Sequence, residues 1–473
     1  MAKRIIITAS ALFLVVVLSA AVVLAMVLAP GALASAAENG AEETNGGEIQ
    51  SPPLHEEGYG AVQLKAPAAG VTLNTSDHIA YVTGDGTGHF NPGSNMTRSQ
   101  IAVILYRLLS ETVPVTVSYS DVPEDSWYAD AAAQLGSLGV LRAGESTFRG
   151  NEYITRGEFA HCVSAFFPMR ADTEQFSDVS PEYEFADDIL SCKAYGWLTG
   201  YADGTFRPEQ LIQRCEAVTL INRAMGRSGD EACIAENRPA LFLDVPVDVW
   251  YYYDVMEVTV PHSFAEGADG TEVWTGFEEA DTGLPEGFRT GGVHLYQGWS
   301  YRYSEEARDI LRSCDESGFV YDANGHFTTG DSEVDQKLRE IVLSRTDPDM
   351  TGDEMLRAVF AYCRDTYRYL KWNLYPAGDT SFMLAAAQRM LSTGRGNCYC
   401  YASVFWYLAR WFGYDAEIFS GAVLGSTHCW VEIDGYIYDT QLEWRYVHDW
   451  GRSRYLWTFY HLQDTRDTYR YRK

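Results

Sequence analysis

The chain has 473 residues, with 36 Lys or Arg against 65 Asp or Glu, so its formal net charge is −29. This length predicts two or three domains. The apolar fraction of 46% and the aromatic fraction of 14% can build packed cores, which excludes a wholly disordered or collagen-like protein. So acidic a chain lacks the clustered positive charge that binds nucleic acid or anionic membranes, and neither is an expected partner. Nine scattered cysteines do not form a disulfide framework.

The N-terminal segment is expected to direct export. Two basic residues precede an apolar run from Ile5 to Leu28, and small residues in an A-x-A pattern follow. This order is typical of a secretory signal peptide over residues 1–36. The apolar run is longer than most signal cores, so an uncleaved anchor remains the alternative, and only then would the chain contact a membrane. Residues 37–76 combine acidic residues with Gly, Ser and Pro, which predicts a flexible linker.

A repeat of 58 residues follows the linker. This interval separates three phenylalanines, Phe90, Phe148 and Phe206, and three arginines, Arg98, Arg156 and Arg214. Each Phe lies in a loop that leads into an expected helix, with Thr97 and Thr155 as N-caps and Glu158 and Glu216 in the first turns. A second half-motif recurs as YSDVP, FSDVS and FLDVP. Each copy precedes apolar residues at helical spacing.

These two half-motifs resemble the S-layer homology repeat over residues 77–262. The resemblance implies an all-α domain of three repeats that attaches a protein to the bacterial cell wall. It also implies binding of an anionic secondary cell-wall polysaccharide by Arg98, Arg156 and Arg214. A guanidinium group at a helix start does suit a carboxylate-bearing sugar. The alternative is that these arginines only pair with neighbouring acids. The second repeat has an LRAGESTF loop and the third has Gln213 and Cys215 beside its Arg, so not every groove need bind.

The C-terminal part predicts a separate domain. Residues 263–303 are rich in Gly and Glu with isolated aromatics, which indicates a linker or small hairpins. Residues 304–473 are expected to form the second domain, which begins with helical periodicity. Within it, Asn397 can cap a helix from Cys398 to Phe412. Cys398 would then lie in the first turn, where the helix dipole favours the nucleophilic thiolate. The preceding glycines Gly394 and Gly396 are expected to let substrate approach.

A predicted hairpin brings a histidine and an aspartate together. The Asp-Gly pair at 434–435 is the preferred two-residue turn between antiparallel strands. The register that it sets places Trp430 opposite Asp439 and makes His428 a diagonal neighbour on the same face. Diagonal neighbours lie about 7–8 Å apart at Cα, so a carboxylate can reach an imidazole. We expect His428 to take the proton of Cys398 and Asp439 to fix the tautomer of the ring.

The segments GNCYCYA, HCWVEI and DGYIYDT resemble the three motifs of the transglutaminase-like superfamily, over about residues 335–445. The resemblance implies an α+β, papain-like cysteine fold with Cys398 as nucleophile, His428 as base and Asp439 as third member. The hairpin is shorter than in many members. The family's acyl chemistry also needs an oxyanion donor. The backbone amide of Cys398 is one candidate, and Trp372 or Asn373 is a possible second.

The sequence therefore predicts an exported, wall-anchored cysteine acyl-transfer enzyme, extracellular in the cell wall or S-layer of a bacterium. Its substrate would be a protein or peptide, and we favour hydrolysis because bacterial members of the family include many presumed peptidases. A cross-linking transglutaminase and a non-catalytic peptide- or glycan-binding protein are the alternatives. No cofactor or metal is expected. The possible ligands Cys398, Cys400, His428 and Cys429 are spaced so that their side chains face different ways.

Overall fold

The structure is a computed structural model that describes residues 70–141, 146–172, 175–268, 270–448, 459–463 and 471–473. The expected signal peptide lies outside the described residues, and so does most of the expected linker. Among the described residues, no helix combines the length and the apolar composition needed to cross a membrane.

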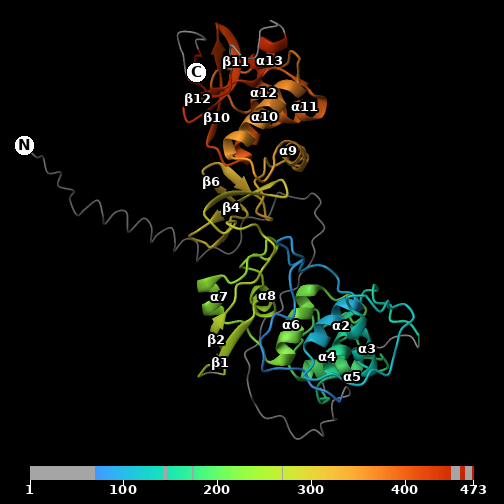
Figure 1. Ribbon diagram of the computed structural model, residues 1–473. Helices are drawn as coiled ribbons and strands as arrows, with labels where there is room; N and C mark the ends of the chain where they lie inside the picture. Colours follow the sequence, from blue (N-terminus) through green and yellow to red (C-terminus); the bar gives the residue numbers. More distant parts are fainter. Residues whose placement is uncertain (1–69, 142–145, 173–174, 269, 449–458, 464–470) are drawn as a thin grey trace, which may run out of the picture. The chain divides into compact units, whose positions relative to one another are not determined.

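The N-terminal part is helical, as predicted (Figure 1). Its helices are α2 (Arg98–Arg107), α3 (Ala129–Ser137), α4 (Arg156–Ser164), α5 (Ala186–Ala194), α6 (Arg214–Met225), α7 (Glu231–Asn237) and α8 (Tyr252–Thr259). They pack in pairs, α2 with α3, α4 with α5, and α6 with α8. Helices α2 and α4 begin with capping boxes on Thr97 and Thr155, and α6 begins with one on Gln213. Each box satisfies backbone amides that a helix start leaves free.

The three repeats close into a ring through the aspartate of each Asp-Val half-motif. Each carboxylate accepts two backbone amides of one loop: Asp121 those of Phe148 and Arg149, Asp178 those of Phe206 and Arg207, and Asp244 those of Phe90 and Asn91. The aspartate of the last half-motif therefore holds the first loop. The array begins with a loop-and-helix half at Phe90 and ends with an Asp-Val half-motif at Asp244, and this link joins these two halves into the third unit.

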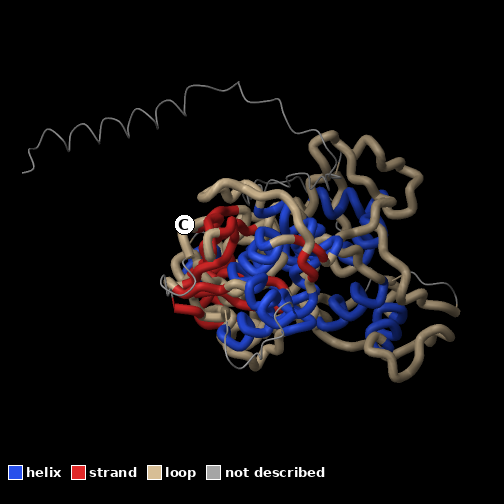
Figure 2. The backbone as a smooth tube through the Cα atoms, turned by 90° about the horizontal axis from the view of Figure 1, so that it is seen from above, coloured by secondary structure: helices blue, strands red, loops and turns tan. Residues whose placement is uncertain are grey.

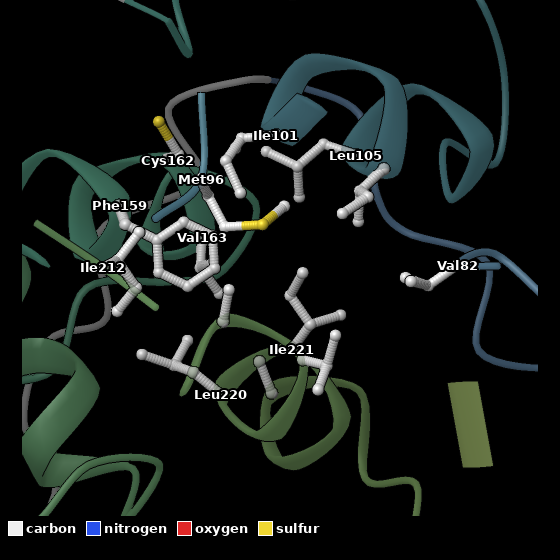
Figure 3. Close-up of a cluster of buried hydrophobic side chains, with 14 of the residues drawn as sticks. Val82, Met96, Ile101, Leu105, Phe159, Cys162, Val163, Ile212, Leu220 and Ile221 are labelled. Atoms are coloured by element: carbon white, nitrogen blue, oxygen red, sulfur yellow. The ribbon is translucent and has the colours of Figure 1, made fainter. Parts of the chain in front are cut away.

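A second ring of backbone hydrogen bonds lies at the pseudo-threefold axis. The amide of Met96 donates to the carbonyl of Ile212, that of Ile212 to Ile154, and that of Ile154 to Met96, at 3.0–3.1 Å. These three residues are spaced by 58 in the sequence. Figure 3 shows Met96 and Ile212 beside Phe159 in the shared core. The repeats are therefore one folding unit, because each supplies one side of the same core.

Short strands connect the helical repeats to the C-terminal part. Strands β1 (His262–Glu266) and β2 (Glu272–Phe277) form a hairpin, and β3 (Gly292–Tyr296), β4 (Trp299–Ser304) and β5 (Asp309–Ile310) form a three-stranded antiparallel sheet. A further hairpin consists of β6 (Cys314–Glu316) and β7 (Phe319–Tyr321). Ser304, at the expected domain boundary, is the last residue of β4 and pairs with Asp309 of β5, so this boundary falls within the three-stranded sheet. The indole of Trp299 stacks on that of Trp411, so these strands contribute to the C-terminal core.

The C-terminal part has the predicted α+β architecture. Its helices are α9 (Ser332–Arg345), α10 (Gly352–Thr366), α11 (Met383–Thr393), α12 (Cys398–Trp411) and α13 (Thr440–His448). Strands β10 (Ala416–Val423), β11 (Ser426–Ile433), β12 (Tyr436–Tyr438) and β13 (Leu462–Gln463) form an antiparallel sheet in that order, and β8 (Arg368–Tyr369) pairs with β9 (Arg395–Gly396). Figure 2 shows the strands of this sheet in red near the C-terminus. Helix α12 packs on β10 and β11, which sets its first residue against the sheet.

Candidate active site

Cys398 is the first residue of α12, where intrahelical acceptors for the first amides are lacking. The helix is almost entirely buried, and Cys398 itself is 4% exposed. Asn397 occupies the N-cap position with extended backbone, but its side chain does not cap the helix. Its Nδ2 instead donates to the carbonyl oxygen of Asn373 at 2.8 Å. The predicted side-chain cap is therefore wrong, because Asn397 ties the 373 segment to the helix start.

The hairpin of β11 and β12 has the predicted register. Asp434 and Gly435 both have positive φ, 51° and 77°, as a two-residue turn of type I′ requires. The pairing runs through Val431 and Tyr438, which sets Trp430 opposite Asp439. The side chains of His428 and Asp439 meet, with Nε2 2.6 Å from Oδ2. Both residues are buried, at 7% and 1% exposure.

Cys398 lies close enough to His428 to raise the pKa of its ring. Since Nε2 faces Asp439, Nδ1 is the ring nitrogen left for the thiol. Burial lowers the pKa of His428, but the charges of Asp439 and Cys398 and the hydrogen bonds to both outweigh it and raise this pKa to about 10. The structure thus brings the three predicted residues together, with His428 in contact with Asp439 and near Cys398.

Asp439 has partners that the sequence did not reveal. Its Oδ1 accepts the backbone amide of Leu442 at 2.9 Å, and its Oδ2 accepts the hydroxyl of Tyr471 at 3.0 Å. Tyr471 lies 32 residues beyond Asp439 in a segment without a motif. Only the tertiary fold could have identified it. The three hydrogen bonds on this carboxylate hold it in the orientation that His428 needs.

The two glycines before Cys398 are structural. Gly394 has φ of 66° and ends α11 in the left-handed conformation, and a Cβ on Gly396 would overlap the side chain of Cys400. Gly394 therefore supplies the left-handed helix end and Gly396 allows close packing against Cys400, and the expected role in substrate approach stays a prediction. The segment that contains the candidate oxyanion residues Trp372 and Asn373 lies close by: the amide of Leu370 donates to the carbonyl of Gly396, and the carbonyl of Asn373 accepts from Asn397.

The eight cysteines other than Cys398 have raised thiol pKa values, which disfavour the nucleophilic thiolate. All nine cysteines are free. Burial raises the pKa of Cys162, Cys215 and Cys400 to about 12, and it also raises the pKa values of Cys192, Cys233, Cys314, Cys363 and Cys429. None of these eight is therefore expected to be a thiolate at neutral pH.

The three repeat arginines differ in their surroundings. Arg98 Nη1 lies 3.4 Å from Glu158 Oε1, and Arg156 forms an ion pair with Glu216. The Nε atoms of both arginines donate to backbone carbonyls, those of Phe148 and Phe206. Both guanidinium groups are buried. Arg98 and Arg156 therefore pair with neighbouring acids, as the alternative interpretation expects.

Arg214 lines a cavity of about 360 Å³. The acids that pair with Arg98 and Arg156 are the N3 residues of the next helix in the ring, α4 and α6. For Arg214 the next helix is α2, and its N3 residue is Gln100, which lines the same cavity. Arg214 Nη2 donates to the carbonyl of Thr83, and its buried Nε has no hydrogen-bond partner.

The same cavity is lined by Arg107 and Trp127, and the Trp127 side chain is 65% exposed. Asp85 also lines it, but hydrogen bonds from Thr87, His89 and Asn91 occupy its carboxylate. Two guanidinium groups, an exposed indole and an amide can bind an acidic sugar chain by ion pairing, stacking and hydrogen bonds.

Comparison with known proteins finds one family that matches the helical repeats and another that matches the C-terminal part. The S-layer homology domain family matches residues 118–160 and 175–218, and the transglutaminase-like superfamily matches residues 336–448. A cellulosome-anchoring protein of Acetivibrio thermocellus is 31% identical over 211 residues, which cover 42% of this chain and 46% of that protein.

Two further relatives match shorter stretches of the chain. Cell surface glycoprotein 1 of the same organism is 34% identical over 208 residues, 40% of this chain and 9% of the relative. A surface-layer 125 kDa protein of Lysinibacillus sphaericus is 30% identical over 151 residues, 30% and 13% of the two chains. The chain thus spans less than half the length of each of these relatives. It carries S-layer homology repeats and a transglutaminase-like core domain, and is a protein of the bacterial cell surface.

Proposed function

We propose that the C-terminal domain is a cysteine acyl-transfer enzyme that hydrolyses peptide or amide bonds in proteins or peptides at the cell wall. The observation that carries this proposal is the arrangement of His428 between Cys398 and Asp439, with Nε2 2.6 Å from the carboxylate. A buried structural cysteine needs neither an imidazole partner nor an aspartate behind it.

The reaction follows from this arrangement. The Cys398 thiolate attacks the substrate carbonyl carbon, and the first-turn amide of α12 donates to the developing oxyanion. The C–N bond breaks as His428 Nδ1 gives its proton to the leaving amine. Water then attacks the thioester and transfers one proton to Nδ1, and the C–S bond breaks to release the carboxylic acid and the Cys398 thiolate beside the imidazolium. Asp439 remains ionised and stabilises the imidazolium.

The acyl acceptor separates this proposal from its rival. An amine in place of water would give a cross-linking transglutaminase with the same three residues. Cys398 and His428 are nearly buried, at 4% and 7% exposure, which favours a narrow acyl donor such as a side-chain amide or an extended peptide. The non-catalytic alternative predicts reversible binding with no thioester.

The test is to trap the acyl-enzyme on Cys398 with a cell-wall digest and to identify the attached fragment by mass. Cys398→Ser serves as the control. An acyl adduct released by water supports hydrolysis, whereas release by added amines in preference to water supports the transglutaminase. Absence of any adduct under conditions where the fragments bind would contradict catalysis.

The repeats are proposed to bind the anionic secondary cell-wall polysaccharide, with Arg214 as the principal contact. The difference between Arg214 and its two counterparts supports this assignment. Arg98 and Arg156 have carboxylate partners, and the position equivalent to those acids around Arg214 is the neutral Gln100. Binding of the full chain to purified walls, before and after removal of the polysaccharide, tests the role. Equal binding to stripped walls would contradict it.

A further inference from the structure

A buried cluster of two histidines and two glutamates lies next to the third repeat, far from Cys398 in the sequence. His78 precedes the first repeat loop, Glu257 lies in α8, His262 begins β1 and Glu272 begins β2. One potential ligand atom from each residue lies within 4.8 Å of all the others. The four side chains are at most 5% exposed. We infer that this cluster is a structural binding site for a divalent transition metal, with Zn²⁺ as the best fit.

The nitrogen and oxygen lone pairs that face one another in the cluster outnumber the protons that could bridge them. His262 Nδ1 lies 2.8 Å from the carbonyl oxygen of Val260, which can only accept, so Nδ1 carries the proton. In neutral His262, Nε2 is then a bare lone pair. It faces His78 Nδ1 at 2.9 Å, Glu272 Oε1 at 2.9 Å and Glu257 Oε2 at 3.3 Å.

Adding a proton to each histidine ring does not give these lone pairs satisfactory hydrogen bonds. It would point two N–H groups at each other across the 2.9 Å between His78 Nδ1 and His262 Nε2. A single proton on His78 would have to serve three acceptors at once. Both carboxylate oxygens of Glu257 are buried without a hydrogen bond, which is costly for an ionised group. A divalent cation at the centre would satisfy all four lone pairs and neutralise both carboxylates.

The spacing of the ligand atoms suits a tetrahedral ion. The distances from each histidine nitrogen to its neighbours in the cluster are 2.8–3.3 Å, and all four ligand atoms lie within 4.8 Å of one another. A tetrahedral zinc site with bonds of about 2.0–2.1 Å has ligand–ligand edges of about 3.3–3.4 Å, so a small expansion admits the ion. Two imidazoles disfavour Ca²⁺ and Mg²⁺, which prefer oxygen ligands.

The surroundings fix the ligands as a metal site requires. The bond from His262 Nδ1 to Val260 orients that ring with Nε2 inward, as in metal-bound histidines. Phe264 stacks on His78 and Trp274 stacks on His262, each at 3.9 Å between ring centroids. Arg227 brings a positive charge near His78. Its Nη2 donates to the backbone carbonyls of Asn74 and Asp77.

A metal here would join three segments of the chain: the entry to the repeats, the last repeat helix and the β1–β2 hairpin. The expected effect is on stability, because binding to the folded state alone raises the melting temperature. The sequence did not predict this site, since its four ligands are spread over 195 positions (78 to 272) without a ligand-spacing motif.

The test uses the full-length, untagged chain with Cys398→Ser, so that the thiol of the active site cannot bind metal. After chelation and dialysis, Zn²⁺ is added and bound metal is measured by elemental analysis. We expect one tightly bound equivalent and a rise of several degrees in Tm. X-ray absorption should give only N and O ligands at about 2.0–2.1 Å. A sulfur shell at about 2.3 Å, or no bound metal, would overturn the proposal.

Variants assign the site. Glu257→Gln and His262→Ala should each lose the bound equivalent and the zinc-dependent rise in Tm, whereas His294→Ala, outside the cluster, should keep both. Replacement by Co²⁺ gives a second readout, because a tetrahedral site has intense visible absorption that an octahedral site lacks. If Glu257→Gln folds and still binds one equivalent with the same spectrum, the assignment fails. If Glu257→Gln does not fold, Glu272→Gln takes its place: it should lose the bound equivalent, and the parent chain should show the tetrahedral cobalt spectrum. The opposite result in either measurement would also reject the assignment.

Discussion

Nε2 of His428 lies 2.6 Å from Oδ2 of Asp439, and the same oxygen accepts the hydroxyl of Tyr471 at 3.0 Å. The other carboxylate oxygen accepts the amide of Leu442. Asp439 therefore cannot rotate without breaking three hydrogen bonds at once. Its fixed position holds Nε2 of His428, and in the proposed mechanism this contact sets both the tautomer and the orientation of the base.

Asp439→Asn should leave the fold intact and lower turnover by about 10²–10⁴-fold, because an amide can present the wrong hydrogen-bonding group to Nε2. The measurement is the rate of acyl transfer with the substrate found by trapping. Asp434→Asn is a matched control: it makes the same chemical change in the turn of the same hairpin, and Asn accepts the left-handed conformation there. Equal turnover in the two variants would remove Asp439 from the mechanism.

Iodoacetamide at mildly acidic pH should alkylate Cys398 before the other eight cysteines. Cys233 and Cys314 are more exposed, but their pKa values are raised by burial and nearby acids, and only thiolates react. Peptide mapping against time gives the order. His428→Ala should slow labelling of Cys398 and leave Cys400 unaffected. Should Cys400 or Cys429 react as fast as Cys398, another residue is the nucleophile.

The pH dependence of stability follows from the raised pKa of His428. Folding raises it from 6.5 to about 10, so the stabilisation by the imidazolium is complete below pH 6.5 and is lost as the pH rises toward 10. Urea unfolding of the parent chain and of Asp439→Asn should therefore differ most near pH 6. The difference should shrink as the pH is raised to 9. A difference that grows over this range would contradict a paired imidazolium.

Local rules predicted the parts of the fold that lie within one element or one turn. The Asp-Gly turn alone sets the register that joins His428 to Asp439, and the spacing of 58 identifies the repeats. Contacts between distant segments were not predictable in this way. Tyr471 reaches Asp439 across 32 residues, and the significance of Gln100 appears only when the ring places α2 after α6.

The repeat arginines should separate into structural and binding residues. Arg156→Gln removes one partner of a buried ion pair with Glu216 and should destabilise the folded chain by about 3–5 kcal/mol. Among the described residues, Arg214 has no such ion pair with a buried acid. Arg214→Gln should therefore cost less stability but weaken wall binding. Denaturant unfolding and wall sedimentation measure the two effects. Loss of wall binding only in Arg156→Gln would reverse the assignment.

Gln100→Glu should weaken wall binding strongly without loss of stability. Glu158 and Glu216 show what a glutamate does at this position: each caps its own helix and pairs with the arginine of the preceding helix in the ring. A glutamate at 100 should keep the capping box on Thr97 and engage Arg214, which then no longer meets the polysaccharide. The matched control is Gln210→Glu, which adds the same charge at an exposed position of the third repeat. Wall sedimentation should show binding by the control and at least a tenfold loss in Gln100→Glu, about 1.4 kcal/mol. Equal binding by both variants would mean that the Arg214 cavity is not the binding groove.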